Sequence, residues 1–99
     1  MKGREMMAST KPVTVYWRQG CGFCASLLMR LDEASIEHEL VNIWEDDAAR
    51  SFVRSVAKGN ETVPTVTVGD EALVNPSLQD VKRALDGKRS RGIFSRRGR

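Results

Sequence analysis

The chain is a short protein of mixed charge. It has 99 residues, with 16 lysines and arginines against 13 aspartates and glutamates, and two cysteines. This length allows one small domain, and no apolar run approaches the roughly 18–20 residues that span a bilayer. Residues 1–11 lack the apolar stretch of an export signal. We therefore expect a cytoplasmic protein, where a close cysteine pair is more often catalytic than structural.

The charge is distributed unevenly along the chain. Residues 88–99 carry six positive side chains and no acid, whereas residues 12–87 carry a net charge of −5. The composition of the basic tail favours a solvated, disordered end, and contact with nucleic acid or an anionic surface is the alternative. We predict a flexible arm over residues 1–11, one domain over residues 12–87 and a disordered tail over residues 88–99.

The first half of the domain begins with a strand and a helix. Residues 13–17 alternate and are β-branched or aromatic, which predicts a strand whose Tyr16 and Trp17 pack partly in the core. Apolar residues then recur at helical spacing from Cys24 to Ala34. Residues 36–43 predict a second strand, and His38 is interpreted as an ordinary residue of that strand.

The second half contains two helices and a hairpin. Asp46 and Asp47 supply N-cap chemistry for a helix that ends with Lys58 and a C′ glycine at Gly59. Residues 65–68 and 72–74 predict two strands joined by a tight turn. The last helix begins with a capping box formed by Ser77 and Asp80 and is stopped by Gly87.

The predicted order is β-α-β-α-β-β-α. A right-handed crossover makes the first two strands parallel, and the closing hairpin is antiparallel. We expect an α/β domain with a four-stranded mixed sheet and helices on both faces.

Cys21-Gly22-Phe23-Cys24 lies at the junction between the first predicted strand and the first predicted helix. A thiol at a helix start meets unpaired N–H groups, here those of Phe23 and Cys24, and the positive end of the helix dipole. Both stabilise a thiolate, which is the form that attacks disulfides. The second thiol lies one turn into the helix, where it should be more buried. We predict that Cys21 is the nucleophile and that Cys24 is the resolving thiol.

Three other interpretations of the cysteine pair stay open. A structural disulfide would close a tiny loop and constrain little of the unfolded chain. A zinc site needs about four ligands, and His38 is the one histidine that could join the two cysteines. The pair could also be inert and buried.

Two other segments can serve the site. Arg18, three residues before Cys21, can stabilise a thiolate or bind a carboxylate, or be an ordinary exposed arginine. Phe23 should be exposed and suggests a contact surface. Thr62-Val63-Pro64 precedes the third predicted strand, a place where proline is tolerated.

The first strand, Arg18, the CGFC motif, Thr62-Val63-Pro64 and the short hairpin before a last helix together resemble a glutaredoxin over residues 12–86. The resemblance implies a thioredoxin/glutaredoxin-like fold. It also implies that Pro64 is cis and faces the cysteine pair, and that Val63 offers backbone hydrogen bonds to a thiol. Phe23 stands where thioredoxins carry a proline.

One segment is closer to a particular branch of that family. Val74-Asn75-Pro76-Ser77 replaces the glycine pair and Ser/Thr-Asp of glutathione-using glutaredoxins, and Pro76 has no N–H to donate. This segment, together with residues 60–66 and Phe52-Val53, closely resembles mycoredoxins, which use the sugar-based thiol mycothiol. The implied thiol-binding residues are Arg18, Phe23, Thr62, Val63, Pro64, Asn75 and Ser77.

The resemblance implies a monomeric oxidoreductase that reduces mixed disulfides between mycothiol and proteins. Mycothiol would be a co-substrate, with no bound cofactor or metal, and mycothiolated proteins and a mycothiol or thioredoxin reductase system would be the partners. No membrane is expected, nor nucleic acid beyond the tail. The alternatives are a dithiol redoxin reduced directly by a thioredoxin reductase, and a carrier of an iron–sulfur cluster. The carriers have CGFS-like motifs, in which serine stands at the position of Cys24.

Overall fold

The computed structural model describes residues 11–87 and contains seven regular elements. In chain order these are β1 (Val13–Trp17), α2 (Gly22–Glu33), β2 (Glu39–Asn42), α3 (Asp47–Val56), β3 (Thr65–Val68), β4 (Glu71–Val74) and α4 (Leu78–Asp86). The predicted order is confirmed. Residues 1–10 and 88–99 lie outside the described residues, so the predicted arm and tail stay predictions. No helix in the described range is both long and apolar enough to cross a membrane.

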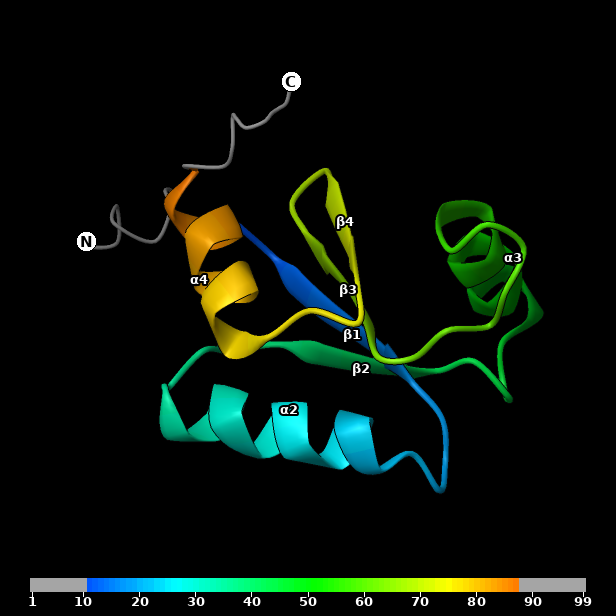
Figure 1. The fold of residues 1–99 in the computed structure, drawn as a ribbon, viewed down its shortest axis with the longest axis horizontal. Coiled ribbons are helices and arrows are strands. Elements are labelled where there is room, and N and C mark those ends of the chain that lie inside the picture. The colour runs from blue at the N-terminus through cyan, green and yellow to red at the C-terminus, as the bar shows by residue number, and fades with distance from the viewer. Residues whose placement is uncertain (1–10, 88–99) are drawn as a thin grey trace.

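The sheet has the order β2-β1-β3-β4 (Figure 1). β1 runs parallel to β2 and antiparallel to β3, and β3 pairs antiparallel with β4. Val15, in the central strand β1, lies opposite Leu40 on one side and Val66 on the other. The predicted parallel crossover and closing hairpin are both confirmed.

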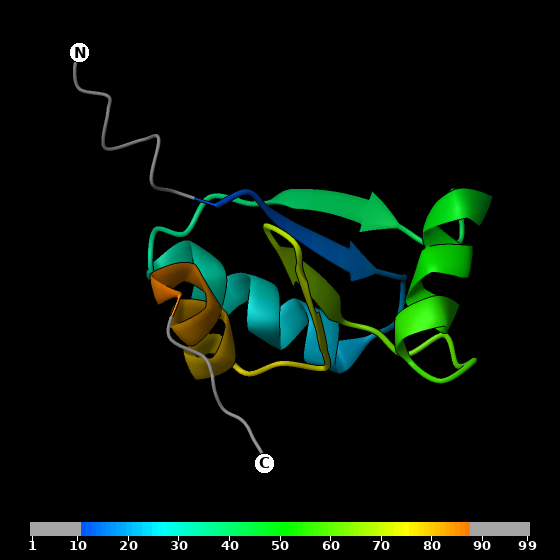
Figure 2. The same ribbon diagram turned by 90° about the horizontal axis from the view of Figure 1, so that it is seen from above.

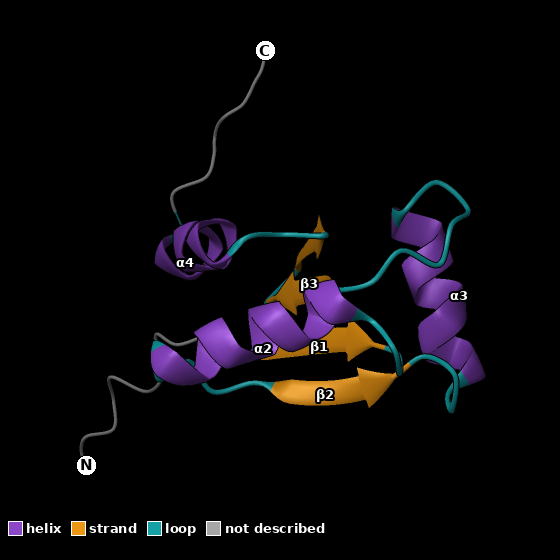
Figure 3. Ribbon diagram, turned by 60° about the horizontal axis from the view of Figure 1, so that its bottom comes forward, coloured by secondary structure: helices purple, strands orange, loops and turns teal. Residues whose placement is uncertain are grey.

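One face of the sheet packs against α2 and α4. Because strand side chains alternate, Val13 and Val15 point to this face. Figures 2 and 3 show α2 running along the sheet with α4 beside it. The buried residues of this first core are all aliphatic: Val13, Val15, Leu27, Leu31, Val66, Val68, Val81 and Ala84. The first core joins the sheet to both helices.

A second core lies at the carboxyl ends of β1 and β2, where α3 packs (Figure 2). Tyr16 points to the face opposite Val15, and its ring lies 5.1 Å from the ring of Phe52 in α3, centroid to centroid. The buried residues of this second core come from four parts of the chain: Cys24, Ile43, Ala49, Val53 and Val63. The second core therefore contains one of the two thiols.

The second strand is shorter than predicted, because β2 spans Glu39–Asn42 rather than residues 36–43. Ser35 has a φ of 58°, and the N–H of Ile36 donates to the carbonyl oxygen of Leu31 at 2.9 Å. Ser35 and Ile36 thus form the C-terminal cap of α2. Pairing with β1 therefore begins only at Glu39. The prediction that His38 is a strand residue is thus wrong: it precedes β2, with Nδ1 2.8 Å from the carbonyl oxygen of Ile36.

The predicted helix starts are correct, and one helix end differs in detail. Asp46 caps α3 by accepting a hydrogen bond from the N–H of Ala49 at 3.0 Å. At the other end of α3, Lys58 takes the left-handed conformation, and the N–H of Gly59 donates to Arg54 O at 2.8 Å. Lys58 rather than Gly59 therefore occupies C′, and Gly59 follows it in a Schellman motif. The capping box of α4 and the left-handed Gly87 are both as predicted.

Candidate active site

Cys21 is the N-cap residue of α2 and has extended backbone angles. Its Sγ accepts a hydrogen bond from the N–H of Cys24 at 3.2 Å, and it lies 3.6 Å from the carbonyl oxygen of Val63. The Cys24 N–H thus points to the sulfur as predicted, whereas no such bond joins it to the N–H of Phe23. Two different parts of the chain therefore contact the Cys21 sulfur. Cys21 is half-buried, so solvent still reaches it.

Cys24 is a free thiol in a different environment. Its side chain is 1% exposed and belongs to the second core. Burial, followed by the hydrogen bond with Cys21, raises the pKa of Cys24 to about 12, whereas the backbone and the charge of Arg18 act in the opposite direction. Cys24 therefore remains protonated near neutral pH, and it is less exposed than Cys21.

The segment before β3 brings a second part of the chain to the cysteines. The Val63–Pro64 peptide bond is cis, as the resemblance implied. Val63 and Pro64 are buried, and the carbonyl oxygen of Pro64 accepts from the N–H of Asn75 at 2.8 Å. Thr62 is half-buried, and its carbonyl oxygen accepts from Thr65 Oγ1 at 2.8 Å. Of these residues, Val63 has the contact with Cys21.

A groove of about 360 Å³ lies beside the CGFC motif, between α2 and the β4–α4 segment. Phe23, which is 74% exposed, forms one side, and Asn75, Pro76 and Ser77 form the other. The remaining lining residues are Ser26, Leu27, Arg30, Leu78 and Gln79. The structure therefore joins three predicted residues, Phe23, Asn75 and Ser77, in one groove. Sequence reasoning missed Ser26, Arg30 and Gln79, which look like ordinary polar positions of two separate helices.

Ser77 also has a structural task. Its Oγ accepts from the N–H of Asp80 at 3.1 Å, and its own N–H donates to Asp80 Oδ2 at 3.0 Å. The hydrogen bond from the Ser77 backbone is the main cause that holds the pKa of Asp80 below its ordinary value. The Ser77 backbone N–H is therefore committed to the cap, while its hydroxyl hydrogen can still be donated to a ligand in the groove.

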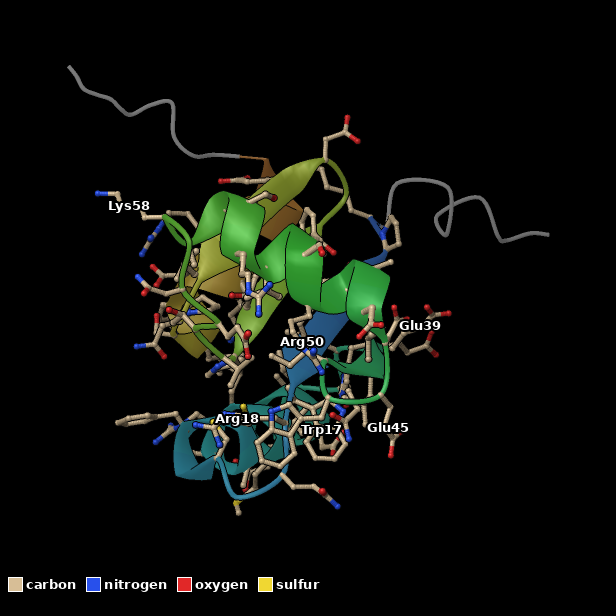
Figure 4. All side chains as sticks on the ribbon, turned by 90° about the vertical axis from the view of Figure 1, so that its right-hand side faces the viewer. Trp17, Arg18, Glu39, Glu45, Arg50 and Lys58 are labelled. Carbon is tan, nitrogen blue, oxygen red and sulfur yellow. The ribbon has the colours of Figure 1, made fainter. Side chains whose placement is uncertain are left out.

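Arg18 lies on another side of the site, outside the groove lining. It is half-buried, and its Nη1 donates to the carbonyl oxygen of Gln19 at 3.2 Å. Its Cζ lies 5.7 Å from the ring centroid of Trp44. Figure 4 shows Arg18, Trp17 and Arg50 gathered between α3 and α2. Sequence reasoning missed Trp44, although it directly follows the predicted strand over residues 36–43 and precedes three acidic residues.

The described residues offer few groups that could hold a metal. Within residues 11–87, no three or more histidine, cysteine, aspartate or glutamate side chains are grouped to bind an ion. Cys21 and Cys24 lie together at the N-terminal end of α2. His38 lies near the other end of this helix, with its Nε2 3.9 Å from Oδ1 of Asp32. The single histidine therefore does not join the cysteines.

Comparison with known proteins gives independent information on the family of this chain. The family model described as glutaredoxin matches residues 13–73. A Mycobacterium tuberculosis protein whose name places it among the glutaredoxins is 42% identical over 77 residues, which cover 77% of this chain and 92% of the relative. Mycoredoxin 1 of Corynebacterium glutamicum is 41% identical over 70 residues, which cover 70% of this chain and 86% of the relative.

A solved structure confirms the fold independently. The crystal structure of glutaredoxin from Archaeoglobus fulgidus is similar with a TM-score of 0.57 at 19% identity, over 93% of this chain and 98% of that one. The family match spans most of the domain and includes the free cysteine pair at the start of α2. The chain belongs to the glutaredoxin family and is a thiol–disulfide oxidoreductase with a CxxC pair.

Proposed function

We propose that this protein reduces mixed disulfides between mycothiol and protein cysteines. The observation that carries this proposal is the groove beside the CGFC motif, which Phe23 lines on one side and Asn75-Pro76-Ser77 on the other. Apart from Arg30, its polar side chains are neutral amides and hydroxyls, from Ser26, Asn75, Ser77 and Gln79. Groups of this kind suit the hydroxyls of a sugar better than the carboxylates of a peptide thiol.

The proposed reaction begins at the more accessible sulfur. The Cys21 thiolate attacks the mycothiol sulfur of the mixed disulfide, and the protein thiolate leaves and takes up a proton. Cys21 is then joined to mycothiol through a new disulfide. A second mycothiol thiolate attacks the mycothiol sulfur of this intermediate, which frees Cys21 and forms mycothiol disulfide. Each step forms one S–S bond and breaks one.

Cys24 provides the other route of resolution. Its thiol can lose a proton and attack Cys21 Sγ, which closes a Cys21–Cys24 disulfide and releases mycothiol. Burial is the largest cause of the raised pKa of Cys24 and does not depend on the free Cys21 thiol. It therefore opposes deprotonation of Cys24 in the intermediate too, so we expect resolution by external mycothiol to dominate. A mycothiol reductase system regenerates the small thiol, or a thioredoxin reductase reduces the internal disulfide.

The other predicted residues have proposed roles in binding. The backbone of Val63 faces Cys21 and offers hydrogen bonds to the thiol's peptide-like part, with Thr62 and Pro64 holding that segment. Phe23 gives an apolar side to the groove, and Asn75 and Ser77 contact sugar hydroxyls. Arg18 binds acceptor groups of the substrate on the opposite side. All these groups come from one chain, so we propose that the protein acts as a monomer, in the cytoplasm and without a bound cofactor.

The choice of thiol follows from Pro76. Glutathione-using relatives hold a carboxylate with backbone donors at this turn, and proline has none. A lost hydrogen bond to a charged group costs about 1.5–3 kcal/mol, or about ten- to a hundredfold in affinity. We expect turnover with mycothiol to exceed turnover with glutathione by at least about tenfold at equal concentration.

The experiment uses one cysteine-containing peptide joined to either mycothiol or glutathione. Turnover is measured with the matching thiol supplied, and in a third arm with thioredoxin reductase and NADPH alone. Asn75→Gly keeps the positive φ of this residue, which is 53°, and removes its amide, so it should lower the rate with mycothiol more than with glutathione. Gln19→Ala, in an exposed loop, is the control. Equal rates with both thiols contradict the proposal, and full activity in the reductase arm favours the dithiol redoxin instead.

A further inference from the structure

Arg18 and Trp44 lie just beyond the carboxyl ends of the neighbouring parallel strands β1 and β2. Trp17, the last residue of β1, pairs with Asn42, the last residue of β2. The N–H of Ile43 then donates to the carbonyl oxygen of Trp17 at 2.9 Å, which extends the pairing by one step. The next residue on each chain segment is therefore fixed relative to the other, and the guanidinium of Arg18 lies over the indole of Trp44 at 5.7 Å.

The backbone at Trp44 is itself held in place. Its N–H donates to Asn42 Oδ1 at 2.9 Å. Arg50 in α3 donates to the carbonyl oxygens of Ile43 at 3.2 Å and of Trp44 at 3.4 Å. Asp47 Oδ1 forms an ion pair with the same guanidinium at 3.5 Å. The loop between β2 and α3 is thus fixed from both ends.

The indole is not part of either core. Trp44 is 51% exposed, although indole is a large apolar group, and the guanidinium of Arg18 lies over its ring. Arg18 directly follows Trp17, which packs with Cys21 against the second core that contains Cys24. The backbone and the charge of Arg18 also lower the pKa of the Cys24 thiol, against the larger effect of burial. A long, flexible arginine side chain loses freedom when it binds a substrate, and a stacking partner reduces that loss by ordering the side chain beforehand.

We propose that Trp44 is a positioning residue for Arg18: its ring holds the guanidinium beside the Cys21–Cys24 pair, where it meets the incoming mixed disulfide. Trp44 acts on binding of the substrate rather than on the exchange of sulfurs. The inference rests on the proposed role of Arg18 in substrate binding. It does not depend on which small thiol forms the mixed disulfide.

The first experiment compares Trp44→Leu, which keeps an apolar side chain without a π face, with Trp44→Phe, which keeps a ring. Leu40→Ala is the matched control, because Leu40 in β2 is also 51% exposed. KM and kcat are measured with the mycothiol and the glutathione mixed disulfides of one peptide. We expect Trp44→Leu to raise KM about two- to fivefold, the scale of an exposed cation–π contact, with kcat changed less than about twofold. Trp44→Phe and Leu40→Ala should stay near the wild-type KM.

The second experiment tests whether Trp44 acts through Arg18. In the Arg18→Gln background, Trp44→Leu should raise KM no further, because the group that it positions is gone. If the KM of the double variant rises by the product of the two single effects, the inference is overturned. It is also overturned if Trp44→Leu changes kcat instead of KM. Wild-type protein gives a check that needs no variant: the Arg18 side-chain protons should show ring-current shifts in NMR spectra, and their absence overturns the inference.

The two proposals fail separately. Thiol preference is measured on the wild-type protein and decides the mycothiol assignment. The coupling between Trp44 and Arg18 is measured as the KM of the single and double variants, with either thiol. Equal use of mycothiol and glutathione with intact coupling contradicts only the thiol assignment, whereas a strong mycothiol preference without coupling contradicts only the role of Trp44.

Discussion

The two cores of the domain offer different chemistry. The first core, between the sheet and the α2 and α4 helices, consists of aliphatic groups alone. The second core, at the carboxyl ends of β1 and β2, includes the thiol of Cys24 and has Cys21, Tyr16 and Trp17 packed against it. Strand ends and a helix N-terminus meet there, so unpaired backbone groups are available next to the sulfurs. Reactivity is therefore concentrated in the core where regular pairing stops.

The largest expected effect separates the two thiols of the site. Cys21→Ser should reduce turnover to the background rate, because a serine hydroxyl is not ionised near neutral pH and cannot replace the thiolate. Cys24→Ser should retain substantial turnover of mycothiol mixed disulfides, since external mycothiol can resolve the intermediate. Both variants are assayed with the same mixed disulfide and checked for folding by circular dichroism. If the two variants are equally inactive, resolution requires the internal disulfide and the monothiol route is wrong.

The next effect tests whether the first core is purely structural. Leu31→Ala removes a fully buried side chain from it and should lower the free energy of unfolding by about 2–5 kcal/mol. The ratio of turnover with mycothiol to that with glutathione should not change where the protein is folded. Urea unfolding measures the stability, and turnover assays with mycothiol and with glutathione measure the ratio. Leu40→Ala, at an exposed position, is the control. A changed thiol ratio in Leu31→Ala would show that the first core also shapes the groove.

A third prediction concerns alkaline pH and the second core. The pKa of Cys24 is raised to about 12 from an ordinary value of 9.0, so the folded protein keeps this proton where the unfolded chain has lost it. This contribution to stability is fully present below pH 9.0 and is lost as pH rises toward about 12. Under reducing conditions, wild type should lose more stability than Cys24→Ala between about pH 8 and about pH 11. Equal losses in urea unfolding would mean that water reaches the Cys24 thiol.

The smallest effect is expected at the rim of the groove. Ser77→Ala removes the N-cap of α4 and should cost about 1 kcal/mol of stability, measured by thermal or urea unfolding, with Ser51→Ala on the exposed side of α3 as control. Asp80→Asn should weaken the same cap in a pH-dependent way. The pKa of Asp80 is lowered by the Ser77 backbone, so its contribution is present above the ordinary carboxyl pKa and is lost as pH falls through the folded-state value. The difference between Asp80→Asn and wild type should therefore shrink in acid, and a constant difference would contradict the capping interpretation.

Local signals in the sequence were enough to predict much of this protein. The strand at residues 13–17, the Asp46 and Ser77 caps and the Gly87 stop depend on neighbours within about one helical turn, so the sequence contains all their partners. The position of Cys21 at a helix N-terminus followed from the same kind of information. The length of β2 could not be predicted, because the end of α2 competes with strand pairing for residues 34–38, and a pattern of apolar residues does not decide between them.

What only the tertiary structure decided are the contacts between distant segments. Val63 lies 42 residues after Cys21 in the chain, and Phe23 and Asn75 meet across one groove although they belong to different elements. The stacking of Arg18 on Trp44 depends on the parallel pairing of β1 with β2 and on the Arg50 contacts from α3. The high pKa of Cys24 arises mainly from burial by other elements. The sequence by itself determined which chemical groups the protein has and which local elements carry them, whereas their distances and desolvation depend on the packing of the whole chain.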